Sequence, residues 1–210
     1  MEFFDFSEPD AFDNLFIENF LGSDAGDGPF NWIVVVVGGR FRTATGRAST
    51  DAQGCASFAF DPWRPPVEGP VHHDGPFLRV PEAGSVERLD LVIDMDPPVI
   101  LPLREITIAG RWVENRVLAG WLEAKIPMEE AAGSWIGELG QSLCAFIGRD
   151  HGSLVDPADD CLHLPACILA ELPEDGFDCA EARLPDTQVA GAPAWTLRAL
   201  FEATPIVLDE

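Results

Sequence analysis

Alternating apolar and polar residues between residues 103 and 126 predict a β-hairpin. Apolar side chains fall on every second position along residues 106–112 and again along residues 118–126. A period of two is typical of a strand that buries one face. Glu114 and Asn115 lie between the two runs, and they suit a tight turn because Asn tolerates a positive φ.

The apolar spacing changes to that of a helix directly after this hairpin. Pro127 suits the first helical turn, and Glu129 and Glu130 suit its positive N-terminal end. We therefore predict one main helix that packs on the sheet, although each of its three glycines weakens it by about 1 kcal/mol relative to Ala. Its apolar face consists of Trp135, Ile136, Leu139, Leu143, Cys144 and Ile147.

Further apolar or alternating runs predict strands at residues 32–37, 40–45, 56–60, 89–95, 99–103 and 195–203. The last run is expected to return to the sheet that contains the hairpin. Many short strands separated by Gly and Pro favour an α+β fold that is mainly antiparallel β-sheet, sandwich-like or barrel-like. The one main packing helix and an N-terminal amphipathic helix complete this prediction.

The N-terminal helix is predicted from Ser7, which suits an N-cap, to Gly22, which suits a stop. Its apolar face consists of Phe12, Leu15, Phe16 and Phe20. Two interpretations remain open. The face packs on the protein's own domain, or it binds a partner's hydrophobic groove that is ringed by basic residues.

The segment at residues 61–85 contains six prolines and is predicted to be a long loop. Loops of this length in a compact domain are usually functional or mobile. We accordingly divide the chain into an acidic, Phe-rich helical arm at residues 1–22 and a single β-rich domain at residues 30–206. The loop also contains His72, His73 and Asp74, but adjacent histidines seldom share a metal ion without distant ligands.

Charge is distributed unevenly along the chain. The net charge is −23, and residues 1–39 contain eight acidic residues and no Lys or Arg. Residues 150–210 contain thirteen acidic residues and two basic ones, so the middle of the chain is nearly balanced. Without a basic patch, direct nucleic-acid binding is disfavoured. Acidic ends indicate either a solvated surface or a basic protein partner.

Five cysteines bear on the compartment of the protein. The chain has no C-x-x-C pair, which removes the basis for zinc-ribbon and thioredoxin-like sites. Two interpretations of the cysteines remain open. They are buried thiols in a cytoplasmic protein, or they form disulfides in an oxidising compartment. The disulfide candidates are Cys144, Cys161, Cys167 and Cys179. The first residues do not resemble a signal peptide, so the protein is cytoplasmic or Met1 replaces a removed export signal.

No familiar catalytic motif is present. The chain contains no P-loop, no dinucleotide-binding glycine pattern and no H-E-x-x-H. No cofactor is predicted, and calcium is the one alternative. It rests on acidic clusters at Asp90, Asp94 and Asp96 and at residues 156–160, neither of which has the spacing of a calcium loop. No apolar run is long enough to predict a transmembrane helix.

The C-terminal half, roughly residues 104–206, resembles a group of bacterial extracytoplasmic lipoproteins of unassigned function. The resemblance rests on Ile108-Ala-Gly110, Leu118-Ala-Gly120, Lys125-Ile126-Pro127, Leu143-Cys144 and Phe201-Glu-Ala203-Thr-Pro205. It implies export to the periplasm or cell surface, disulfides and no known catalysis. The chain departs from the pattern because it lacks a lipobox cysteine.

Three functions follow from these observations. We favour a non-enzymatic, extracytoplasmic, β-rich binding or structural protein. The alternative is a cytoplasmic acidic partner protein that binds a basic protein through its acidic ends and Phe-rich arm. The second alternative is an enzyme of unknown class, which rests only on His72, His73 and Asp74.

Overall fold

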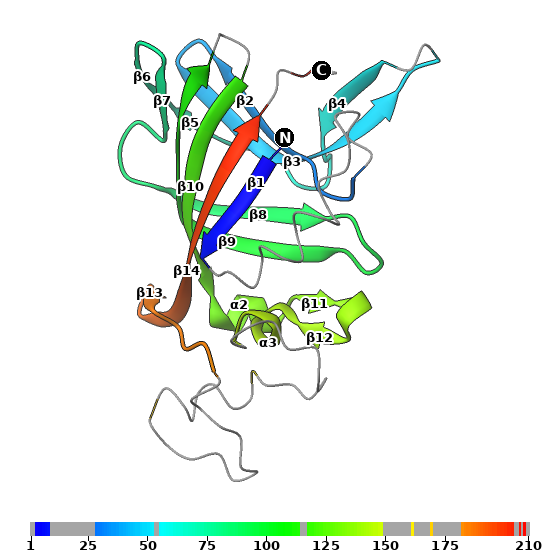
Figure 1. The fold of residues 1–210 in the computed structure, drawn as a ribbon, viewed down its shortest axis with the longest axis vertical. Coiled ribbons are helices and arrows are strands. Elements are labelled where there is room, and N and C mark those ends of the chain that lie inside the picture. The colour runs from blue at the N-terminus through cyan, green and yellow to red at the C-terminus, as the bar shows by residue number, and fades with distance from the viewer. Residues whose placement is uncertain are drawn as a thin grey trace.

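The computed structural model describes residues 3–8, 28–52, 55–113, 117–148, 161, 169, 182–203, 206 and 208. Most of these residues lie in antiparallel β-sheet, as predicted. The larger sheet has eight strands. Figure 1 shows that it curls into a half-barrel, with a smaller sheet beside it and helices near one end.

The larger sheet is built around β9 (Val99–Val113), its longest strand. β10 pairs with one edge of β9, while β7 and β8 pair with the C-terminal and N-terminal parts of the other edge. The strand order is β1-β14-β10-β9-β7-β6, and β13 pairs with β14. The other strands are β1 (Phe3–Glu8), β6 (His72–Asp74), β7 (Phe77–Val80), β8 (Val86–Ile93), β10 (Val117–Pro127), β13 (Thr187–Val189) and β14 (Ala192–Ala203).

The smaller sheet begins with a hairpin of β2 and β3, joined at Gly38 and Gly39. Both glycines have positive φ values, which a two-residue hairpin turn favours. β3 continues past this hairpin to pair with β4 and β5. The strands are β2 (Trp32–Val37), β3 (Arg40–Thr50), β4 (Ala56–Phe60) and β5 (Val67–Pro70).

The predicted hairpin is confirmed as β9 and β10, and the predicted closing strand is confirmed as β14, which pairs with β10. One β-bulge adjusts the hairpin near Glu105, whose φ is 51°. Thr107 pairs with Glu123, but Arg104 pairs with Lys125, so β9 carries one extra residue there. The bulge keeps the core side chains of both halves of β9 on one face of the curled sheet.

The prediction of one main helix after Pro127 is wrong. The chain instead forms α2 (Met128–Ala132), β11 (Trp135–Ile136), the 3-10 turn η1 (Gly137–Leu139), β12 (Gln141–Ser142) and α3 (Leu143–Gly148). The left-handed φ of 65° at Gly140 ends η1. Gly137 packs against Pro97, where a β-carbon would lie 2.7 Å from the proline Cδ. The glycines therefore allow turns that interrupt the helical spacing.

The segment at residues 61–85 is not one long loop, because it contains β5, β6 and β7. Gly75, with a φ of 59°, lies in the turn that joins β6 to β7. Pro70 is the last residue of β5, while Pro76 and Pro81 flank β7. Prolines at strand ends interrupt no ladder hydrogen bonds, which is why a proline-rich segment still joins both sheets.

The N-terminal segment begins with β1, which pairs with β14 at an edge of the larger sheet. Ser7, which we predicted as an N-cap, lies within this strand. The rest of the predicted helix lies outside the described residues, including its apolar face of Phe12, Leu15, Phe16 and Phe20.

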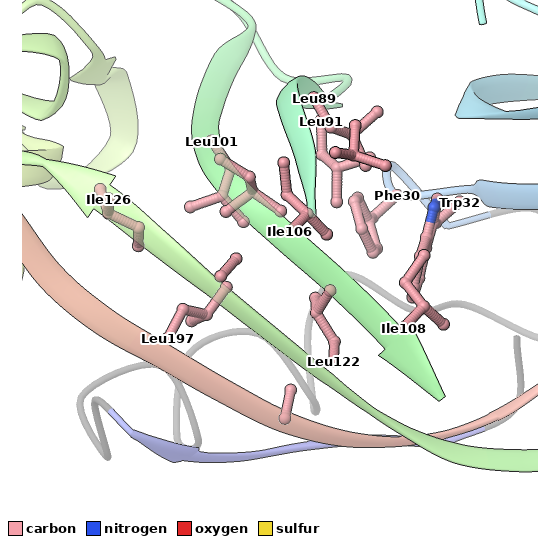
Figure 2. Close-up of a cluster of buried hydrophobic side chains, with 14 of the residues drawn as sticks. Phe30, Trp32, Leu89, Leu91, Leu101, Ile106, Ile108, Leu122, Ile126 and Leu197 are labelled. Carbon is pink, nitrogen blue, oxygen red and sulfur yellow. The ribbon is translucent and has the colours of Figure 1, made fainter. Parts of the chain in front are cut away.

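The core lies between the inner face of the larger sheet and the smaller sheet (Figure 2). Trp32 of β2 packs against Phe201 of β14, with ring centroids 5.4 Å apart and an edge-to-face angle of 70°. The Trp32 indole N–H donates to the Thr43 hydroxyl at 2.7 Å. The same core cluster contains Phe30, Leu89, Leu91, Leu101, Ile106, Ile108, Leu122, Ile126 and Leu197.

Candidate functional site

The outer face of the larger sheet carries a row of side chains that crosses five strands. Directly paired residues of antiparallel strands point to the same face. The pairings therefore align Leu200 of β14, Trp121 of β10, Ala109 of β9, Arg79 of β7 and His72 of β6. Trp121 and Leu200 are exposed, although large apolar side chains are usually buried.

A second row runs beside the first. It aligns Glu202 of β14, Ala119 of β10, Arg111 of β9, Phe77 of β7 and Asp74 of β6. In the first row the small Ala109 of β9 lies beside Trp121 of β10. In the second row the small Ala119 lies on β10, and the aromatic Phe77 lies on β7. The rows therefore leave a hollow between the two aromatic side chains.

This hollow, which we call the aromatic groove, has a volume of about 390 Å³. The Phe77 side chain is 55% exposed and that of Trp121 is 43% exposed. Most of the lining is apolar, as in many small-molecule sites. The lining consists of His72, Phe77, Leu78, Arg79, Ala109, Gly110, Arg111, Ala119, Gly120 and Trp121.

A pair of glycines, Gly110 and Gly120, underlies the floor of the aromatic groove. A β-carbon on Gly120 would lie 2.3 Å from the Ala109 carbonyl oxygen and 2.9 Å from the Phe201 ring. Glycine thus lets Phe201 approach the sheet from the core side. On the outer side, the small side chains of Ala109 and Ala119 leave the groove unfilled. The same part of the sheet therefore determines both the core packing and the shape of the groove.

Two arginines make the lining of the aromatic groove locally positive. The Arg111 guanidinium carbon lies 5.8 Å from the Phe77 ring centroid, a distance typical of a cation–π contact. Arg79 donates to the carbonyl oxygens of Glu82 at 3.1 Å and Gly84 at 3.4 Å. Among the described residues, no carboxylate belongs to the lining.

A second hollow, of about 380 Å³, lies between the smaller sheet and β8. Trp63 stands at it with 82% of its surface exposed. The buried Asp61 carboxylate accepts from the Trp63 backbone N–H at 3.0 Å and pairs with Arg47 at 3.7 Å. Its charged lining residues are Arg47, Asp61, Arg64 and Asp94. The balance of two bases and two acids favours no ligand charge.

An ion-pair cluster centred on the buried Arg104 links β8, β9 and α2. Arg104 of β9 donates to Asp90 of β8 at 3.0 Å and to Glu130 of α2. Arg88 also donates to Asp90, at 2.6 Å. Burial opposes the charge on Asp90, but the hydrogen bonds from Arg88 and Arg104 outweigh it, and the pKa of Asp90 falls below its ordinary value. We assign the cluster a structural role.

The residues weighed as possible metal ligands do not come together within the described part of the chain. His72, His73 and Asp74 lie exposed on the edge strand β6, and no group of three metal-ligating side chains occurs in the described part. Asp90 is paired with arginines, which removes it from the calcium alternative. Residues 156–160 lie outside the described residues. His72 instead lines the aromatic groove.

One disulfide joins Cys144 of α3 to Cys161, with a Cα–Cα distance of 5.8 Å. Both cysteines were disulfide candidates, whereas Cys167 and Cys179 lie outside the described residues. Cys55 is an exposed free thiol. No helix in the described part of the chain is long and apolar enough to cross a membrane.

Sequence reasoning missed the aromatic groove, although Trp121 carried a signal. Trp121 is a large aromatic residue at an outward position of an otherwise alternating strand. Phe77 gave no signal because its short strand lies in the segment that we predicted to be a loop. Searches against family models, curated proteins and solved structures find no match to this chain.

Proposed function

We propose that this chain is a non-enzymatic, extracytoplasmic binding protein that holds its ligand in the aromatic groove. The observation that carries this proposal is the pairing of two exposed aromatic walls, Phe77 and Trp121, across a floor of small residues. Exposed aromatic side chains that flank a hollow are typical of recognition surfaces. The groove is a concave surface with apolar walls, which a small apolar ligand could contact on both sides.

The disulfide between Cys144 and Cys161 supports the extracytoplasmic part of the proposal, since such bonds persist in oxidising compartments. A non-reducing peptide map of protein isolated from its native host tests this part. We expect a linked pair of peptides that contain Cys144 and Cys161. Fully reduced cysteines in such protein would contradict export.

Isothermal titration calorimetry with 2-naphthoate tests the groove, because a naphthalene ring is a flat apolar probe of suitable size. Replacing Trp121 with Ala removes one wall, and we expect it to weaken binding by about tenfold, the effect of losing one aromatic stacking contact. Trp135→Ala is the matched control, since Trp135 is 49% exposed but lies in β11, away from the lining. Equal affinities of the two variants would refute binding in the groove.

A further inference from the structure

We propose that the aromatic groove selects planar small molecules that carry a carboxylate or a similar anionic group. This inference rests on the function proposed above and adds the chemical class of the ligand. The aromatic walls would contact the flat apolar part of the ligand. The guanidinium groups of Arg79 and Arg111 would bind its anionic group.

The first argument is the contrast between the groove and the rest of the chain. The chain has 36 acidic residues against 13 Lys and Arg, yet two arginines and no described carboxylate line this hollow. Arg79 is paired with Ala109, and Arg111 follows two residues further along β9. Diagonal neighbours of this kind lie about 7–8 Å apart, so both arginine side chains border the same hollow.

The second argument is that both arginines are already oriented. Carbonyl oxygens of the turn after β7 hold Arg79, and the Phe77 ring supports Arg111. A guanidinium group has five N–H donors, so the two hydrogen bonds of Arg79 leave others for a ligand. Groups that are held in place before binding lose less entropy when the ligand arrives.

The third argument favours a compact ligand over an acidic protein or a long polyanion. Asp74 and Glu202 lie at the two ends of the row that contains Arg111. Carboxylates at both ends would repel a chain of negative charges that crosses the whole face. A volume of about 390 Å³ also falls in the range of small-molecule pockets.

Matched probes of different charge test this inference by calorimetry. 2-Naphthoate and 2-naphthamide share the same ring, but only the first is an anion. We expect the wild-type protein to bind naphthoate at least about tenfold more tightly than naphthamide, because charge-assisted hydrogen bonds are the stronger kind. Added salt should reduce this preference, since it screens exposed charges.

Arg79→Met and Arg111→Met should each reduce the preference for naphthoate and leave naphthamide binding within about twofold, because Met keeps an apolar chain of similar length. Arg198→Met is the control, since Arg198 lies on the same outer face but pairs with Glu123. Circular dichroism of each variant checks that the fold is retained.

Equal affinities for the two probes in the wild-type protein would overturn the anion selectivity. If both probes still depended on Trp121, the groove would remain a binding site, and only its selectivity would be refuted. If neither probe bound, or neither responded to Trp121→Ala, the proposed function itself would fail. A dimer in sedimentation analysis that Trp121→Ala abolished would overturn the small-molecule ligand, because a second copy would then occupy the face.

Discussion

At the scale of single residues, Gly120 connects the core of this protein to its outer surface. Its missing side chain makes room for Phe201 on the inner face, while Ala119 and Trp121, its neighbours in the chain, point outward. One face of β10 thereby packs in the core, and the other face forms part of the floor of the aromatic groove. A change at Gly120 is expected to disturb both.

Gly120→Ala should lower the free energy of unfolding by about 1–3 kcal/mol, the usual cost of overpacking. The added β-carbon would lie 2.3 Å from the Ala109 carbonyl oxygen, so the backbone must shift. Urea denaturation measures the change. Gly133→Ala is the control, because its β-carbon would meet only ordinary contacts of 3.5 Å or more. Equal stabilities of the two variants would show that the close approach of β9 and β10 is wrong.

The lowered pKa of Asp90 predicts how the free energy of unfolding depends on pH. Hydrogen bonds to arginines hold its pKa below the ordinary value, so its contribution is present above the unfolded-state pKa of about 4. That contribution is lost as the pH falls through the lower folded-state value. The wild type should therefore lose stability toward acid more steeply than Asp90→Asn.

At neutral pH, Asp90→Asn should reduce the free energy of unfolding by about 1–3 kcal/mol, because the buried Arg104 loses a charged partner. Denaturation curves at several pH values measure both effects. Asp94→Asn is the control, since Asp94 is exposed on the same segment. Parallel pH profiles for the wild type and Asp90→Asn would contradict the ion-pair cluster.

At the scale of elements, the sequence predicted long strands well and short elements poorly. β9, β10 and β14 are long, and each alternates over enough positions to show its buried face. The apolar residues after Pro127 also have helical spacing, but of the predicted apolar face only Leu143, Cys144 and Ile147 lie in an α-helix, which is α3. Turns at Gly137 and Gly140 interrupt the predicted helix, and apolar periodicity alone does not reveal such turns.

The disulfide should stabilise α3, which is buried throughout its length. Its cysteines are 17 residues apart, and closing a loop of that size typically contributes about 3 kcal/mol. Cys161→Ser should therefore lower the free energy of unfolding by roughly that amount. Adding reductant should destabilise the wild type but not Cys161→Ser. Cys55→Ser, which removes only the exposed thiol, should behave like the wild type.

At the scale of the whole molecule, the aromatic groove depends on strands that are far apart in the sequence. Phe77 and Trp121 lie on either side of β9 only because β7 and β10 pair with opposite edges of that strand. A single sequence does not reveal this pairing, so only the outward Trp121 pointed to the site. The curl of the sheet and the strand order place the two aromatic walls around the alanine floor.

The most direct test of this account is to locate a bound probe. Chemical-shift changes in a ¹⁵N–¹H correlation spectrum, recorded while 2-naphthoate is added, report which backbone amides it contacts. We expect the largest shifts at Ala109, Gly110, Ala119 and Gly120, which form the floor of the groove. Shifts confined to the hollow beside Trp63, or no shifts at saturating probe, would contradict a binding site on the outer face of the larger sheet.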